Sequence, residues 1–138
     1  MPVKVARPLK VMLIDDNIID LKINAKIINI TGLFDEIIMC HSGEEAIAYF
    51  RNHSAEPDQL PHLILLDIQM PEMDGFEFLN AYKQFPEALK SKTTIAMLSS
   101  TLDFGDTRKA EANPYVSQLL KKPLLTSNLQ RIFNEYFM

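Results

Sequence analysis

The sequence has few of the residues that build cross-linked or membrane-anchored proteins. It has one cysteine, Cys40, in 138 residues. A single cysteine excludes an internal disulfide and a cysteine metal cluster, and it suits a reducing compartment such as the cytoplasm. The apolar run at 9–14 is too short for a signal-peptide core or a membrane span. These absences predict a cytoplasmic protein without membrane insertion.

The sequence also lacks an excess of positive charge. Its 14 lysine and arginine residues are outnumbered by 18 aspartate and glutamate residues, which gives a net charge of -4. That balance argues against direct binding to nucleic acid or to an anionic membrane. The composition, 47% hydrophobic and 23% charged, is ordinary for a globular protein. The length predicts a single domain over 1–138, with its core at about 10–137.

Two apolar runs end in carboxylates. The run at 63–66 leads into Asp67, and the run at 11–14 leads into Asp15 and Asp16. Continuous apolar runs of this length are typical of buried parallel strands, and open α/β sheets bind their ligands at the C-terminal ends of strands. Three carboxylates on neighbouring strand ends repel one another unless a positive group lies among them. The pattern therefore predicts a divalent metal site beside a nucleophilic aspartate.

Strand-like and helix-like segments alternate along the whole chain. Alternation with short connections implies a parallel sheet covered on both faces, so the fold class is α/β, a doubly wound five-stranded parallel sheet with five helices. The first helix has isoleucines at helical spacing, Ile19, Ile23, Ile27 and Ile30, and Leu21 and Ile28 widen this stripe, which predicts an amphipathic helix. We predict strands at 9–14, 36–41, 63–67, 93–98 and 116–120, helices at 18–31, 43–50, 75–82, 102–113 and 127–136, and at 87–92 a loop that can contain a helical turn.

Five polar residues follow the predicted strands directly. They are Asp15, Asp16, Asp67, Ser99 and Lys122. The C-terminal ends of parallel strands share one edge of the sheet, so these side chains can converge although they are far apart in sequence. Each one alone has a simpler explanation, such as a helix cap, a turn residue or a solvated surface lysine. Their joint placement favours a common site.

These motifs resemble the receiver domain of two-component response regulators. The resemblance rests on Asp15-Asp16, on Asp67 with a following Met-Pro-x-x-Asp-Gly turn, on Ser99-Ser100 and on Lys122-Pro123. The resemblance covers nearly the whole chain, and the chain also resembles the small stand-alone regulators that are common in Bacteroidetes. It implies a flavodoxin-like receiver architecture and a phosphoacceptor function in a two-component phosphorelay.

The resemblance also implies a role for each site residue. Asp67 would accept the phosphoryl group, while Ser99 and Lys122 would bind phosphoryl oxygens. Asp15, Asp16, Asp67 and the backbone carbonyl of Gln69 would hold Mg²⁺, which prefers oxygen ligands.

The partners implied are a sensor histidine kinase or a histidine phosphotransfer protein, and a downstream protein that the sequence does not name. The protein would be a signalling phosphoacceptor and not an enzyme, although it would promote its own Mg²⁺-dependent phosphorylation and dephosphorylation.

One position departs from the family pattern. Many receivers carry an aromatic residue three positions before the site lysine, and here that position is Leu119. An aromatic switch would have to be replaced by Leu119 or Tyr115. We therefore predict that signalling depends on the loop after Ser99 and on the helix at 102–113.

Several alternatives remain open at this point. The chain could be a binding-only receiver-like module or a receiver fragment of a hybrid kinase. An aspartate-dependent phosphohydrolase normally has a second acid two residues after its nucleophile, where this sequence has Gln69. A flavin carrier needs a hydroxyl- and glycine-rich phosphate loop after the first strand, where Asp15 and Asp16 would repel phosphate.

Overall fold

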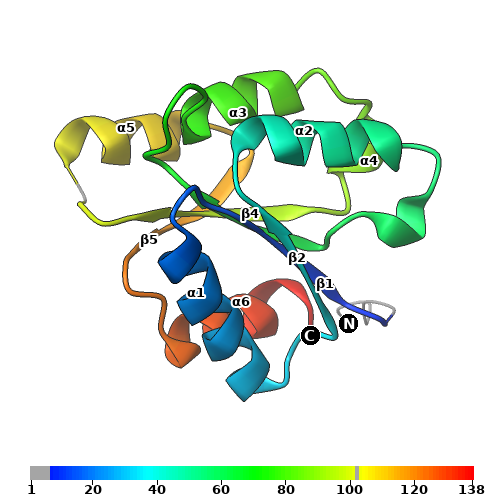
Figure 1. Cartoon of the computed structure of the whole chain (residues 1–138), viewed down its shortest axis with the longest axis horizontal. Coiled ribbons are helices and arrows are strands. Elements are labelled where there is room, and N and C mark those ends of the chain that lie inside the picture. Colours follow the sequence, from blue (N-terminus) through cyan, green and yellow to red (C-terminus); the bar gives the residue numbers. More distant parts are fainter. Residues whose placement is uncertain (1–6, 102) are drawn as a thin grey trace.

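Five parallel strands form one central sheet in the computed structural model, which describes residues 7–101 and 103–138 (Figure 1). The order across the sheet is β2-β1-β3-β4-β5, so the chain starts near the middle and winds toward both edges. This is the predicted flavodoxin-like doubly wound topology. The strands are β1 (Lys10–Ile14), β2 (Glu36–Cys40), β3 (Leu63–Asp67), β4 (Thr94–Ser99) and β5 (Val116–Lys121).

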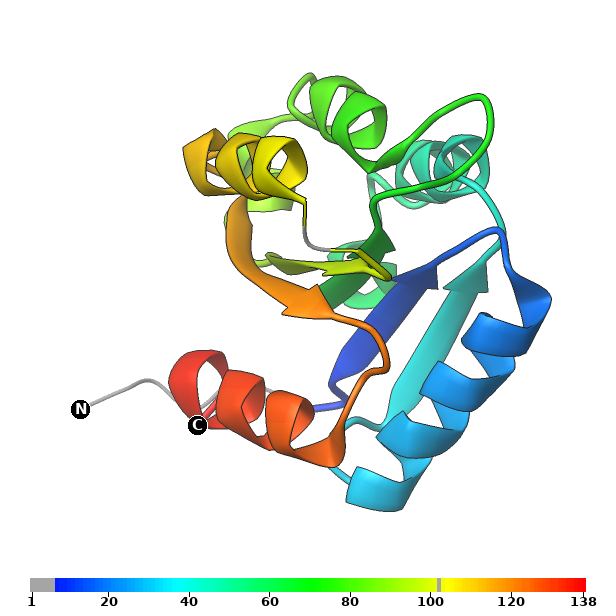
Figure 2. The same ribbon diagram turned by 90° about the vertical axis from the view of Figure 1, so that its left-hand side faces the viewer.

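Helices cover both faces of the sheet. On one face lie α2 (Gly43–Asn52), α3 (Gly75–Tyr82), α4 (Glu87–Lys90) and α5 (Phe104–Ala112); on the other lie α1 (Ile18–Thr31) and α6 (Thr126–Tyr136) (Figures 1 and 2). The structure thus has six α-helices in its described residues where the sequence predicted five. The additional helix, α4, is a single turn within the loop at 87–92, where the sequence allowed a helical turn, and its four residues are too few to show an apolar period. A single 3₁₀ turn covers Pro57–Gln59.

The central strands are buried on both sides. Every residue of β1 and β3 is buried. Alternate side chains of a strand point to opposite faces, so each strand feeds two apolar clusters. Met12 and Ile64 belong to the cluster beneath α2 and α3, whereas Leu13 and Leu65 belong to the cluster beneath α1 and α6. This two-sided burial explains why the strands are continuous apolar runs instead of alternating ones.

Only part of the predicted apolar stripe of α1 is buried. Ile19 is 69% exposed, Ile23 48% and Ile30 65%, whereas the helix is buried through Leu21, Asn24 and Ile28. The predicted stripe is wider than the buried face because isoleucines occur around most of this helix. Leu21 and Ile28, which were predicted to widen the stripe, form its buried side, and periodicity alone does not show which side of a wide stripe faces the core. The isoleucines therefore form an apolar surface on the outside of the molecule.

The helix ends are set by local hydrogen bonds. The Asn17 side chain caps α1 by accepting from the Asp20 amide, so the cap is Asn17 and not Asp16. Gly32, at φ 65°, ends α1 in the left-handed conformation that glycine adopts without strain. Asp74 caps α3 and forms a reciprocal capping box with Glu77.

Several boundaries lie one or two residues from their predicted positions. The helix predicted at 102–113 begins at Phe104 and ends at Ala112; Leu102 lies outside the described residues, as do residues 1–6. The last helix begins at Thr126, one residue earlier than predicted. None of the described helices is both long and apolar enough to cross a membrane.

Gly75, the first residue of α3, lies against the end of β3. A Cβ placed there would be 2.7 Å from the Asp67 carbonyl oxygen and 3.0 Å from Ile68 Cα, both backbone atoms. We expect Gly75→Ala to lower the free energy of unfolding by about 2–3 kcal/mol, because α3 and the strand end must move apart. Urea denaturation measures this loss.

Gly105 provides the matched control for Gly75→Ala. A Cβ on Gly105 meets only one Asp103 carboxylate oxygen, at 3.5 Å. Because alanine favours helix, Gly105→Ala should leave stability unchanged or raise it by up to about 1 kcal/mol. Equal stabilities for the two variants would contradict the close approach at Gly75.

Candidate functional site

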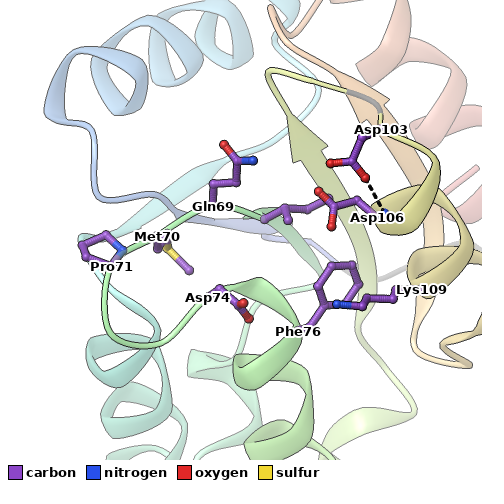
Figure 3. Close-up of a pocket in the computed structure, with 9 residues that line it drawn as sticks. Gln69, Met70, Pro71, Asp74, Phe76, Asp103, Asp106 and Lys109 are labelled. Atoms are coloured by element: carbon purple, nitrogen blue, oxygen red, sulfur yellow. Dashed lines mark hydrogen bonds between the residues drawn. The ribbon is translucent and has the colours of Figure 1, made fainter.

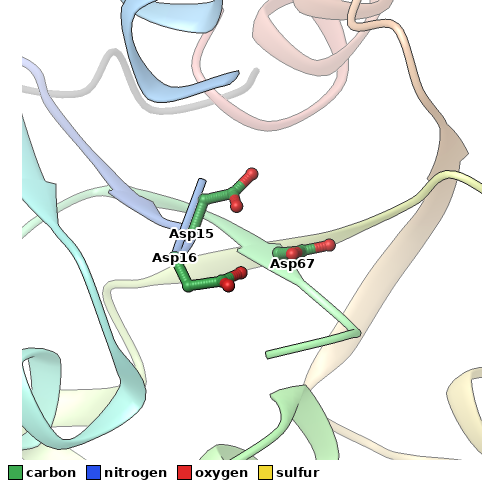
Figure 4. Close-up of side chains that lie close together, drawn as sticks. All are labelled: Asp15, Asp16 and Asp67. Atoms are coloured by element: carbon green, nitrogen blue, oxygen red, sulfur yellow. The ribbon is translucent and has the colours of Figure 1, made fainter. Parts of the chain in front are cut away.

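Three carboxylates gather beyond the ends of β1 and β3. Each of Asp15, Asp16 and Asp67 offers a carboxylate oxygen within 4.8 Å of the others (Figure 4). The sheet register explains this, because Ile14 pairs with Leu66 and the residues that follow them emerge side by side. Asp15 and Asp67 are buried, whereas Asp16 is exposed. The two strand ends thus build a half-open cluster of oxygen atoms.

This cluster fits a divalent cation that binds oxygen. Its donors are carboxylates alone, which suits Mg²⁺ better than zinc, and the exposed Asp16 leaves the outer side of the site open to water. The Asp15 carboxylate also accepts a hydrogen bond of 2.9 Å from the Asn17 amide, which fixes its orientation. Asp16 is not used as a helix cap and therefore faces the cluster without that competing role.

Lys122 supplies the positive charge of the cluster. Its Nζ lies 3.0 Å from Asp15 Oδ2, 3.0 Å from Asp20 Oδ2 and 3.4 Å from Asp67 Oδ1. The Lys122 amide donates a 2.8 Å hydrogen bond to the Ser99 carbonyl, which holds the end of β5 beside the end of β4. The structure therefore brings together Lys122 and the carboxylates predicted from the sequence.

The sequence analysis missed Asp20. This residue lies in the first turn of α1. An acidic residue in that position is commonly explained by its attraction to the helix N-terminus, so the sequence gives no reason to assign Asp20 to the site. Only the tertiary fold brings the first turn of α1 to the segment after β5, where Asp20 meets Lys122, which is 102 residues away.

The carboxylates and the lysine shift one another's protonation. Burial raises the pKa of Asp67 to about 7, with a further rise from the nearby Asp15 carboxylate and an opposing effect of Lys122. Burial by itself lowers the pKa of Lys122, but hydrogen bonds to Asp15 and Asp20 raise it above its usual value. The site therefore keeps a charged ammonium among carboxylates that carry excess negative charge, an arrangement that favours a further cation.

The structure leaves the roles of Ser99 and Gln69 as predictions. Ser99 ends β4 and is fully buried, but its hydroxyl donates to the Thr101 carbonyl and accepts from the Thr101 amide, 3.2 Å away. The hydroxyl is thus bonded within its own loop and not to Asp67. Gln69 lies two residues beyond Asp67, in the loop before α3. The metal-binding role of its carbonyl stays a prediction.

A separate hollow lies beside the site, between the loop after β3 and the helices α3 and α5 (Figure 3). Its volume is about 560 Å³. Two of its three carboxylates have local structural roles, since Asp74 caps α3 and Asp103 caps α5 through the Asp106 amide at 2.7 Å. None of the five converging residues described above lines the hollow. Its lining consists of Ile68, Gln69, Met70, Pro71, Asp74, Phe76, Asp103, Asp106 and Lys109.

Comparison with known proteins gives one consistent result. A family model described as the response regulator receiver domain matches residues 11–134. The chain is 30% identical over 128 residues to the probable methanogenesis regulatory protein FilR2 of Methanothrix harundinacea, a match that covers 93% of this chain and 81% of FilR2. It is 30% identical over 130 residues to hybrid signal transduction histidine kinase B of Dictyostelium discoideum, of which it spans only 6%.

The solved structures agree with the sequence matches. A two-component response regulator from Cytophaga hutchinsonii is 34% identical and superposes with a TM-score of 0.87, which covers 95% of this chain and 98% of that one. The superposition therefore extends over nearly the whole of both chains.

Proposed function

The chain belongs to the response regulator receiver family, and from this premise we propose that Asp67 is its phosphoacceptor. The observation that carries the proposal is the convergence of Lys122, Asp15 and Asp16 on the buried Asp67 carboxylate at a strand end. A binding-only module has no need for that set of charges.

The transfer forms one bond and breaks another. An Asp67 carboxylate oxygen bonds to phosphorus as the bond from phosphorus to a histidine nitrogen of the donor breaks, and that nitrogen keeps the electron pair. Aspartate is a weak nucleophile, so the site acts mainly through alignment and neutralisation of charge. Bound Mg²⁺ supplies positive charge to the phosphoryl oxygens. We assign its ligands as Asp15, Asp16, Asp67 and the Gln69 carbonyl.

Lys122 and Ser99 hold the phosphoryl group in this proposal. Lys122 already points at Asp67 and donates to one phosphoryl oxygen through a charge-assisted hydrogen bond. Ser99 would leave its hydrogen bonds to Thr101 and donate to another. The protein is accordingly a phosphoacceptor that promotes its own phosphorylation and dephosphorylation, and not a turnover enzyme.

The movement of Ser99 links the site to α5. Thr101 lies in the loop that leads into this helix, and Ala110 is its one buried residue among those described. A helix with so little buried surface shifts at low energetic cost. Its first residue, Phe104, is 75% exposed and offers an apolar contact to a downstream protein. These features support the prediction that the signal leaves through α5.

The exposed isoleucines of α1 support a protein as the phosphodonor. Ile18 and Ile19 follow the acidic cluster directly in sequence and are exposed, as is Ile23 one turn on. A histidine kinase or phosphotransfer protein must cover the surface around Asp67 to deliver its phosphoryl group, and an apolar face beside the site provides contact area. Such partners place the protein in the cytoplasm, which its single cysteine suits.

Intact-mass spectrometry tests the proposal. We expect one phosphoryl adduct after incubation with acetyl phosphate and Mg²⁺, and none when EDTA replaces Mg²⁺. A small-molecule donor bypasses the protein contacts of α1, so the experiment examines the site alone. Phosphoramidate serves as a second donor. Absence of an adduct with both donors, together with absence of Mg²⁺ binding by calorimetry, would contradict the proposed function.

A further inference from the structure

Asp20, which the sequence did not predict as a site residue, contacts the side chain of Lys122. Its Oδ2 lies 3.0 Å from Lys122 Nζ, as close as Asp15 and closer than Asp67. The Asp20 side chain is 35% exposed, whereas that of Asp15 is 4% exposed. Asp20 therefore holds the lysine from the rim of the site.

The Lys122 ammonium has three N–H donors, and the structure offers it three carboxylates. Two of these carboxylates, Asp15 and Asp67, also belong to the group of oxygen atoms suited to a metal ion. The lysine and a divalent cation consequently compete for the same two side chains. Asp20 is absent from that group, so it stays available to Lys122 when the other two bind an ion.

The position of Asp20 is rigid. Its backbone amide donates to the Asn17 side chain at 3.1 Å, and the next residue, Leu21, is 2% exposed in the core. The first turn of α1 is therefore fixed both by its cap and by packing. Because this helix turn is fixed, the Asp20 carboxylate gives the Lys122 ammonium a partner at a defined position.

We propose that Asp20 is a positioning residue that retains the Lys122 ammonium when Mg²⁺ binds Asp15, Asp16 and Asp67, and so reduces competition between the lysine and the ion. This inference rests on the proposed function, because it assumes that the acidic cluster binds Mg²⁺. Asp20 touches neither the phosphoryl group nor the ion in this arrangement; its effect passes through Lys122.

Calorimetric titration with Mg²⁺ tests the first part of the inference. We expect Asp20→Asn to weaken Mg²⁺ binding about fivefold, because a partly exposed charge pair has a modest but measurable value. Asp58→Asn is the matched control. Asp58 is exposed in the 3₁₀ turn before β3, toward the N-terminal end of that strand, whereas the site lies at the C-terminal strand ends. Its replacement changes the net charge equally. That control should bind Mg²⁺ like the wild type.

Lys122→Met tests whether Asp20 acts through the lysine. Removal of the competing ammonium should strengthen Mg²⁺ binding, and in this background Asp20→Asn should change the affinity by less than about twofold. A fivefold loss in both backgrounds would mean that Asp20 acts on the ion by its own charge and would overturn the inference. Unchanged affinity in Asp20→Asn alone would also overturn it. A wild-type protein that binds no Mg²⁺ would instead reject the proposed metal site itself.

Discussion

Replacing Asp67 with asparagine is expected to abolish the phosphoryl adduct formed with acetyl phosphate and Mg²⁺. The amide has nearly the same shape as the carboxylate but provides no anionic oxygen to attack phosphorus. The fold should persist, because Asp15 and Asp20 still hold Lys122. The variant also loses one of the mutually repelling carboxylates, so its unfolding free energy should stay equal to that of the wild type or exceed it by about 1 kcal/mol.

Asp103→Asn is the matched control for this experiment. Asp103 is another carboxylate, which lines the hollow beside the site and caps α5 by accepting from the Asp106 amide. Asparagine caps a helix as well as aspartate does, so this variant should keep both its stability and its phosphoryl adduct. If Asp67→Asn still acquired a Mg²⁺-dependent adduct, another side chain would be the phosphoacceptor.

Lys122→Met is expected to have the largest effect on stability. The lysine side chain is 16% exposed and lies among carboxylates that are 4% and 7% exposed, those of Asp15 and Asp67. Removing one partner of a buried ion pair leaves uncompensated charge, so the unfolding free energy in EDTA should fall by about 3 kcal/mol. Mg²⁺ should restore much of this loss, because it binds the folded state and neutralises the same carboxylates.

Lys121→Met is the matched control, because it removes one positive charge from the residue next to Lys122. Lys121 is exposed, in contrast to Lys122. Its replacement should change the unfolding free energy by less than about 0.5 kcal/mol, with or without Mg²⁺. Urea denaturation of both variants in EDTA and in Mg²⁺ provides the comparison. Equal and Mg²⁺-independent losses would show that Lys122 does not neutralise the acidic cluster.

The architecture of the sheet could be predicted because its evidence is local. The apolar runs that end at Asp67 and at Ile14 can be buried on both sides only in the middle of a parallel sheet. Alternation of strands and helices then orders the chain, and parallel strands bring their C-terminal ends to one edge. At α4 the sequence allowed a helical turn but did not predict a helix, because four residues after Pro86 show no apolar period.

The face of α1 shows where sequence evidence becomes ambiguous. Isoleucines occupy several sides of this helix, and the stripe through Ile19, Ile23 and Ile30 is as regular as the one through Leu21 and Ile28. Contact with β1 and α6 selects the second stripe. That selection depends on how the helix is rotated against the sheet, which no single segment encodes.

The sequence by itself determined the α/β class, the strands of the central sheet and the edge at which Asp15, Asp16, Asp67 and Lys122 meet, because each follows from local patterns and from the geometry of parallel strands. Only the tertiary structure decided that Ser99 bonds within its own loop, that α1 presents isoleucines to the outside and that Asp20 reaches Lys122. These features depend on side-chain directions and on distances between segments far apart in the chain, and they arise only when the helices pack against the sheet.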